Sequence, residues 1–274
     1  MVARSHRRSQ PAEGTRSRRS KRVLIVVAHP DDEAIFFFST IRELRQEGFS
    51  VRVVCVTGDF GNAVITTTRL NEFYDSCRRL GVQGQTLRLE DRRGGSLCLA
   101  SLLAGLRACT LDSFDRVYTH GPWGDYGHLH HAGVCHAVHE VFGEGVFSLA
   151  GPLGSQSGHV LSEAEYRAKL EHLATSYPSQ RFAWPWATAQ EAFAEFRPQE
   201  AMFLARVALG IAVPPWRSER EEGSRIRIQV LNSFLRGYSG SADTIPHEVR
   251  EIPKKVWCER IEGFRITLEN SLAG

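Results

Sequence analysis

Residues 23–33 read VLIVVAHPDDE and hold both the first strand and the first polar turn of the chain. The run from Val23 to Ala28 is continuous and rich in β-branched residues, which is typical of a strand buried on both faces of a parallel sheet. His29, Pro30 and two aspartates follow directly, and a helical pattern comes next. This strand–turn–helix unit indicates an α/β fold, in which ligand sites lie where the strands end.

The same alternation continues along the first half of the chain. It implies right-handed βαβ units, and so a Rossmann-like three-layer α/β fold with a mostly parallel sheet. Beyond residue 150 the pattern is less regular, so we expect an elaborated C-terminal third with a loop at 151–158. The expected strands span 23–28, 51–57, 85–89 and 116–119, and the expected helices span 32–47, 66–80, 99–111, 130–142, 163–176 and 188–205.

The composition is that of an ordinary globular protein, with 42% hydrophobic and 24% charged residues. The net charge of +3 comes from the N-terminus, because residues 1–22 carry eight basic residues and one acidic residue. We expect residues 1–21 to form a disordered basic tail and residues 22–274 to form a single domain, with 205–274 left unassigned. A nucleic-acid role for this tail is the lesser alternative; we predict neither a nucleic-acid nor a membrane partner.

The location predicted from the sequence is the cytoplasm. There is no apolar run of about 18 residues that could span a membrane, and the N-terminal segment lacks the apolar middle of a secretory signal. The six cysteines are scattered without a C-x-x-C pair, as in a reducing compartment.

The turn after the first strand carries metal-binding residue types. His29, Asp31 and Asp32 place an imidazole and two carboxylates together, and no G-x-G-x-x-G is present for a dinucleotide. Neighbouring aspartates point in different directions, so one can bind a metal while the other faces water. Helix capping is the structural alternative for the two aspartates, although it does not explain His29.

A second polar segment follows the strand predicted at 116–119. Residues 118–131 read YTHGPWGDYGHLHH, and four of the eleven histidines fall between His120 and His131. Together the two segments predict three protein ligands and an open position, as in catalytic zinc sites. Spacing alone does not decide which of the histidines at 128, 130 and 131 binds the metal. The aromatic Trp123 and Tyr126 are candidates to stack on a substrate.

The two segments together resemble the PIG-L/LmbE-like de-N-acetylases. That family pairs A-H-P-D-D-E with a later G-H-x-x-H at a helix start, and Arg69-x-x-Glu72 and Tyr177-Pro178-Ser179-Gln180 are similar to its further elements. Many members read H-P-D-H where this chain has an imidazole at position 130 in place of the aspartate. A second imidazole can still hydrogen-bond the one at position 128, but it favours an imidazolium less than a carboxylate does.

The resemblance implies a function and a role for each matching residue. His29, Asp32 and His131 would bind zinc, Asp31 would be the general base, and His128 would stabilise the oxyanion or protonate the leaving amine. Arg69 and Tyr126 would contact the substrate.

The reaction implied is hydrolysis of the acetamide of an N-acetylglucosamine-type sugar conjugate, a small molecule. Iron(II) suits the same ligands. The alternative is a non-catalytic metal- or sugar-binding module with the same fold, and the oligomeric state is left open.

Overall fold

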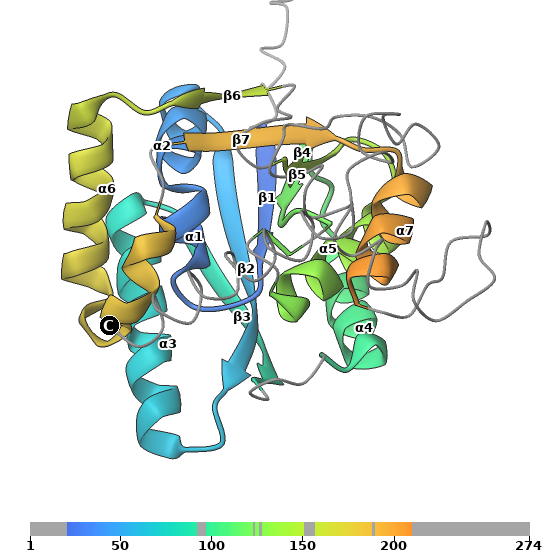
Figure 1. The fold of residues 1–274 in the computed structure, drawn as a ribbon, viewed down its shortest axis with the longest axis horizontal. Coiled ribbons are helices and arrows are strands. Elements are labelled where there is room, and N and C mark those ends of the chain that lie inside the picture. The colour runs from blue at the N-terminus through green and yellow to red at the C-terminus, as the bar shows by residue number, and fades with distance from the viewer. Residues whose placement is uncertain are drawn as a thin grey trace, which may run out of the picture.

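The computed structural model describes residues 21–91, 97–122, 124–125, 128–150, 157–187 and 190–209. The predictions for the basic tail, for residues 151–156 of the expected loop and for 210–274 lie outside these residues. The described part contains a seven-stranded sheet in the order β3-β2-β1-β4-β5-β7-β6 (Figure 1). Its strands are β1 Arg22–Val27, β2 Ser50–Asp59, β3 Gln83–Glu90, β4 Arg116–Thr119, β5 Val146–Leu149, β6 Ser157–Val160 and β7 Gln190–Glu195.

Helices cover both faces of this sheet. They are α1 Asp32–Phe36, α2 Phe38–Gln46, α3 Ala63–Leu80, α4 Leu99–Cys109, α5 Leu129–Phe142, α6 Glu163–Ser176 and α7 Pro198–Ala208, with a 3-10 helix η1 at Pro178–Trp186. Figure 1 shows α1, α2, α3 and α6 on one side and α4, α5 and α7 on the other. The predicted Rossmann-like α/β fold is therefore confirmed. None of the helices in the described ranges is long and apolar enough to cross a membrane.

The strand β1 separates the two apolar layers, as its continuous apolar run predicts. Val23, Ile25 and Val27 pack with α2 and α3, whereas Leu24 and Val26 pack with α4 and α5. The strands β3, β2, β1, β4 and β5 run parallel to one another. The carboxyl ends of β1 and β4 therefore lie side by side at one edge of the sheet.

The single helix predicted over residues 32–47 is wrong, because the structure has two helices that meet at Phe37. The break leaves the backbone N–H groups of Ser39 and Thr40 to donate to the Glu191 carboxylate, at 3.1 and 2.8 Å. Lys169 pairs with the same carboxylate at 3.0 Å, and both charged side chains are fully buried. This cap comes from a strand far along the sequence, so the local pattern could not predict it.

The helix predicted over residues 188–205 is also wrong. Residues 190–195 form β7, which pairs antiparallel with β5 and β6, and the helix α7 begins only at Pro198. Gln, Glu and Ala favour helices locally, but pairing in a sheet overrides that weak preference. The strands β5 and β6 were not predicted either, and β6 includes Ser157 and Gly158 of the expected loop.

Candidate metal centre

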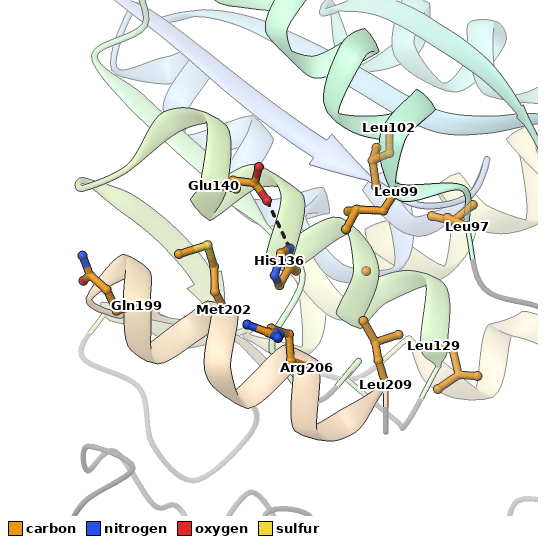
Figure 2. Close-up of a pocket in the computed structure, with 11 residues that line it drawn as sticks. Leu97, Leu99, Leu102, Leu129, His136, Glu140, Gln199, Met202, Arg206 and Leu209 are labelled. Carbon is orange, nitrogen blue, oxygen red and sulfur yellow. Dashed lines mark ion pairs between the residues drawn. The ribbon is translucent and has the colours of Figure 1, made fainter. Parts of the chain in front are cut away.

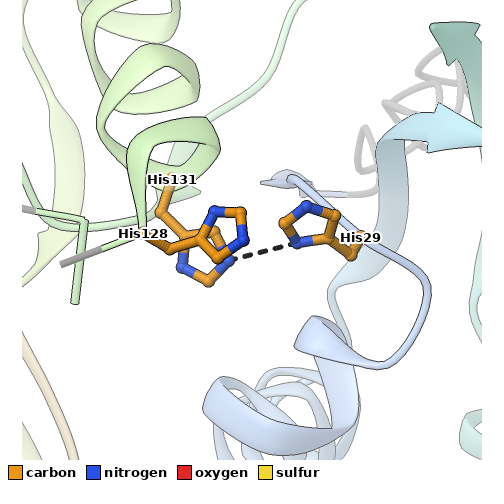
Figure 3. Close-up of side chains that lie close together, drawn as sticks. All are labelled: His29, His128 and His131. Carbon is orange, nitrogen blue, oxygen red and sulfur yellow. Dashed lines mark hydrogen bonds between the residues drawn. The ribbon is translucent and has the colours of Figure 1, made fainter. Parts of the chain in front are cut away.

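Two polar turns meet at the carboxyl ends of β1 and β4. The first turn carries His29 out of β1, and the second ends at His128, the N-cap of α5. Figure 3 shows His29 facing His128 and His131 across the space between these two elements. The predicted convergence of the two segments is therefore present in the structure.

Three side chains, those of His29, Asp32 and His131, bring their donor atoms into a small triangle. His29 Nδ1 lies 3.2 Å from His131 Nε2 and 3.4 Å from Asp32 Oδ2, and the third side measures 3.5 Å. Donors at about 2.1 Å from a tetrahedral zinc ion are about 3.4 Å apart, so the triangle fits such an ion. All three side chains are buried.

The charge states of this triangle also suit a metal. Burial lowers the pKa of both His29 and His131, which keeps the imidazoles neutral with lone pairs to donate. Burial works against ionisation of Asp32, but the adjacent His131 and His120 hold its pKa well below the usual range. The donor set, two neutral imidazoles and a carboxylate, is one that zinc and iron(II) both accept.

Two neighbouring histidines use ring nitrogens for other contacts. Ligand atoms of His120 lie within 4.8 Å of those of Asp32 and His131, and ligand atoms of His128 lie within 4.8 Å of those of His29 and His131. His120 Nε2 accepts the Ala28 N–H at 2.9 Å, and His128 Nδ1 accepts the His130 N–H at 3.2 Å. The proton of neutral His128 therefore lies on Nε2, which makes that nitrogen a hydrogen-bond donor.

Asp125 hydrogen-bonds the ring nitrogen of His131 that is not part of the triangle. Its Oδ2 accepts from His131 Nδ1 at 2.7 Å and from His120 Nδ1 at 2.6 Å, while Oδ1 accepts the Gly121 N–H at 2.8 Å. A proton on Nδ1 leaves Nε2 of His131 unprotonated and turned towards the triangle. Sequence reasoning missed Asp125, although a carboxylate between histidines in a polar loop is a detectable signal for a partner of this kind.

The general-base candidate, Asp31, occupies a constrained position at the N-cap of α1. Its φ of 116° is unusual for a residue with a side chain. Arg69 contacts both the Asp31 carboxylate at 3.2 Å and the Pro30 carbonyl at 2.6 Å. Burial raises the pKa of Asp31 well above its usual range, and the Arg69 guanidinium opposes that shift. Arg69, which we expected to contact the substrate, thus contacts the Asp31 turn, and its role towards the substrate stays a prediction.

The remaining motif residues also form hydrogen bonds, and Glu33 forms a buried support for this turn. Glu33 accepts the Asp31 N–H at 3.3 Å and also bonds Ser76 and Tyr177. Burial raises the pKa of Glu33 to about 7, against the hydrogen bonds from Ser76 and Tyr177. Glu72 accepts from the backbone and the hydroxyl of Ser179, at 2.9 and 2.6 Å. The R-x-x-E and Y-x-S-Q elements therefore meet one another in space.

Two predicted substrate contacts cannot be placed. Trp123 and Tyr126 lie outside the residues that the structure describes. Their predicted roles therefore stay predictions.

A cavity of about 680 Å³ lies on the other face of α5 (Figure 2). Leucines at its wall include Leu97, Leu99 and Leu129, and the ion pair between His136 and Glu140, at 3.8 Å, lies on α5. None of the three residues of the triangle lines this cavity. Gln199 and Arg206 also line the cavity, and none of its described lining residues is in a group that could hold a metal ion.

Known proteins resemble this chain over its first half. Residues 24–142 match the family model described as GlcNAc-PI de-N-acetylase. A probable N-acetylglucosaminyl-phosphatidylinositol de-N-acetylase from Dictyostelium discoideum is 40% identical over 68 residues, which cover 24% of this chain and 26% of the relative. The chain thus matches only about a quarter of the length of that relative.

Solved structures with a similar arrangement share little sequence. A deacetylase of teicoplanin biosynthesis, in complex with teicoplanin, is 17% identical, with a TM-score of 0.48 and coverage of 61% of this chain and 90% of that one. The 4-carboxy-2-hydroxymuconate hydratase GalB from Pseudomonas putida is 16% identical, with a TM-score of 0.45 and coverage of 61% and 83%. These two proteins catalyse different reactions, so the likeness does not indicate one.

Proposed function

Since residues 24–142 belong to the PIG-L/LmbE-like de-N-acetylase family, we propose that this chain is a metal-dependent deacetylase. The proposed substrate is a small-molecule conjugate of an N-acetylglucosamine-type sugar, and the products are acetate and the free amino sugar. The relative from Dictyostelium discoideum supports this substrate class by its name. One structural observation carries the proposal: three donors of the right type, 3.2–3.5 Å apart, lie beside a buried carboxylate.

His29, Asp32 and His131 are the proposed metal ligands. The donor set and its spacing fit zinc, with iron(II) as the other candidate. When bound, such an ion supplies a Lewis acid that polarises a carbonyl oxygen and makes a water molecule more acidic.

Asp31 is the proposed general base. Arg69 and the Glu33 support fix the turn that carries the carboxylate, so its direction is set before the substrate binds. The water oxygen bonds to the acetyl carbon as Asp31 takes its proton, and the C–N bond then breaks. The proton passes to the departing nitrogen, which leaves as an amine while acetate is released.

His128 is the proposed donor to the acetyl oxygen. Its Nδ1 is occupied by the His130 N–H, so the Nε2–H is the group that can stabilise negative charge on that oxygen. The ring stacks on His131 at a centroid distance of 4.8 Å, which holds it next to the triangle. This arrangement favours the oxyanion role over an imidazolium acid.

The test is acetate release from a panel of N-acetylglucosaminides with different aglycones. Zinc-loaded protein should release acetate from at least one member, and chelator-treated protein should release none. If metal is bound but no member yields acetate, the deacetylase proposal fails for this substrate class. That outcome would favour the second candidate, a non-catalytic metal- or sugar-binding module, which the imidazole at position 130 supports.

A further inference from the structure

His130 is the second residue of α5, and its ring lies against a proposed ligand. Its Nδ1 is 2.9 Å from Nε2 of His29, and the side chain is almost fully buried. From the sequence, this ring was free to hydrogen-bond His128 in place of the aspartate. The structure instead shows the hydrogen bond to His29 and places Asp91 Oδ1 at 3.6 Å from the same nitrogen.

The proposed metal centre decides the direction of this hydrogen bond. His29 contributes Nδ1 to the triangle, so the proton of its neutral ring must be on Nε2. That N–H points at His130 Nδ1, which therefore accepts, and the proton of His130 lies on its own Nε2. His130 thus serves His29 as Asp125 serves His131, by accepting the hydrogen bond of the nitrogen turned away from the metal.

The length of the contact separates this explanation from a second metal position. His29, Asp91 and His130 also form a group whose ligand atoms lie within 4.8 Å of one another. Two nitrogens that share a zinc ion are about 3.4 Å apart, whereas the heavy atoms of an N–H hydrogen bond are closer, at about 2.7–3.2 Å. The 2.9 Å separation between His29 and His130 is therefore that of a hydrogen bond.

We propose that His130 is a positioning residue that holds His29 in the orientation and tautomer needed for metal binding. This inference rests on the proposed metal centre and deepens it. A partner of this kind typically changes metal affinity by about 10–100-fold. A neutral imidazole accepts less strongly than a carboxylate, so this chain holds His29 less firmly than an aspartate at position 130 would.

Three substitutions at this position test the proposal. His130→Leu removes the acceptor, His130→Asn keeps a neutral acceptor where Nδ1 was, and His130→Asp supplies a charged one. The readout is the zinc dissociation constant of the full chain, measured by chelator competition. We expect the leucine variant to bind zinc about 10–100-fold more weakly, the asparagine variant to stay close to the unmodified chain, and the aspartate variant to bind more tightly than the asparagine variant. His136→Asn, on the same helix but at the cavity wall, is the matched control and should leave the constant unchanged.

Several outcomes would overturn the proposal. Equal affinity in the leucine variant and the unmodified chain removes the positioning role, and so does an equal loss in the leucine and asparagine variants. If the leucine variant does not fold, the comparison of asparagine with aspartate decides, and equal constants refute the proposal. A second bound ion that disappears in Asp91→Asn would show a metal position in place of the hydrogen bond. If the unmodified chain binds no metal, the proposed metal centre itself fails. That result differs from equal zinc dissociation constants across the variants of a chain that binds zinc, which would refute only the role of His130.

Discussion

Replacing Asp125 with asparagine perturbs the hydrogen bonds behind the proposed metal ligand His131 while keeping the shape of the side chain. One carboxylate oxygen accepts from two imidazoles at 2.6 and 2.7 Å, and the other accepts the Gly121 N–H at 2.8 Å. An asparagine has one acceptor and one donor. Either orientation of its amide therefore places N–H against N–H, towards Gly121 or towards both imidazoles.

The size of the effect follows from these bonds. Hydrogen bonds to a charged group contribute about 1.5–3 kcal/mol and neutral ones about 1 kcal/mol, so weakening two of them removes about 1–4 kcal/mol. Part of this loss appears as metal affinity, because His131 is then no longer held with Nε2 unprotonated. We expect zinc binding to weaken by about 10–100-fold, which corresponds to about 1.4–2.7 kcal/mol.

The assay is zinc competition against a chromophoric chelator, with thermal unfolding of the metal-free protein measured in parallel. Asp75→Asn is the matched control, because that carboxylate pairs with Arg79 on the surface of α3. The control should bind zinc like the unmodified chain. An Asp125→Asn variant that is folded and binds zinc with unchanged affinity would refute the positioning of His131 by Asp125.

Three further predictions concern the base, the buried ion pair and pH. Asp31→Asn should keep zinc bound but slow acetate release by about 100-fold or more, and near-normal turnover would contradict its role as base. Lys169→Met should lower the free energy of unfolding by about 3–5 kcal/mol in urea titrations, because it leaves Glu191 buried without its cation; a loss below about 1 kcal/mol would contradict this. Burial lowers the pKa of His139 to about 4 from an ordinary 6.5. Between pH 4 and pH 6.5, His139 is therefore protonated in the unfolded chain but neutral in the folded chain. Stability should be complete above pH 6.5 and fall by about 3 kcal/mol as the pH drops to 4, and His139→Gln, which keeps an amide near Ser148, should remove this part of the slope.

The sequence predicted the parts of the fold that depend on local patterns. The continuous apolar run of β1 and the amphipathic pattern of α3 reflect burial, and burial repeats with the period of each element. Asn62 caps the start of α3 and Gly81 ends it with a φ of 68°, so chemistry near each end marks its boundaries. The convergence of His29 with α5 followed from the rule that parallel strands end at the same edge.

The features that were missed depend on partners far along the chain. The break at Phe37 is stabilised by Glu191, and β7 is a strand because β5 and β6 flank it. The contact of His130 was missed for the same reason. Its ring lies edge-on to that of His128, at a centroid distance of 5.0 Å, while its Nδ1 bonds His29, which is 101 positions away in the chain.

The most direct test of the metal centre is a zinc titration of chelator-treated protein, followed by acetate release from a sugar that the panel identifies as a substrate. We expect activity to be absent without metal, to rise with each addition and to level off at one ion per chain. We also expect His131→Ala to abolish this rise at the same concentrations. Acetate release that does not depend on added metal, or that rises equally in His131→Ala, would contradict a centre built from His29, Asp32 and His131.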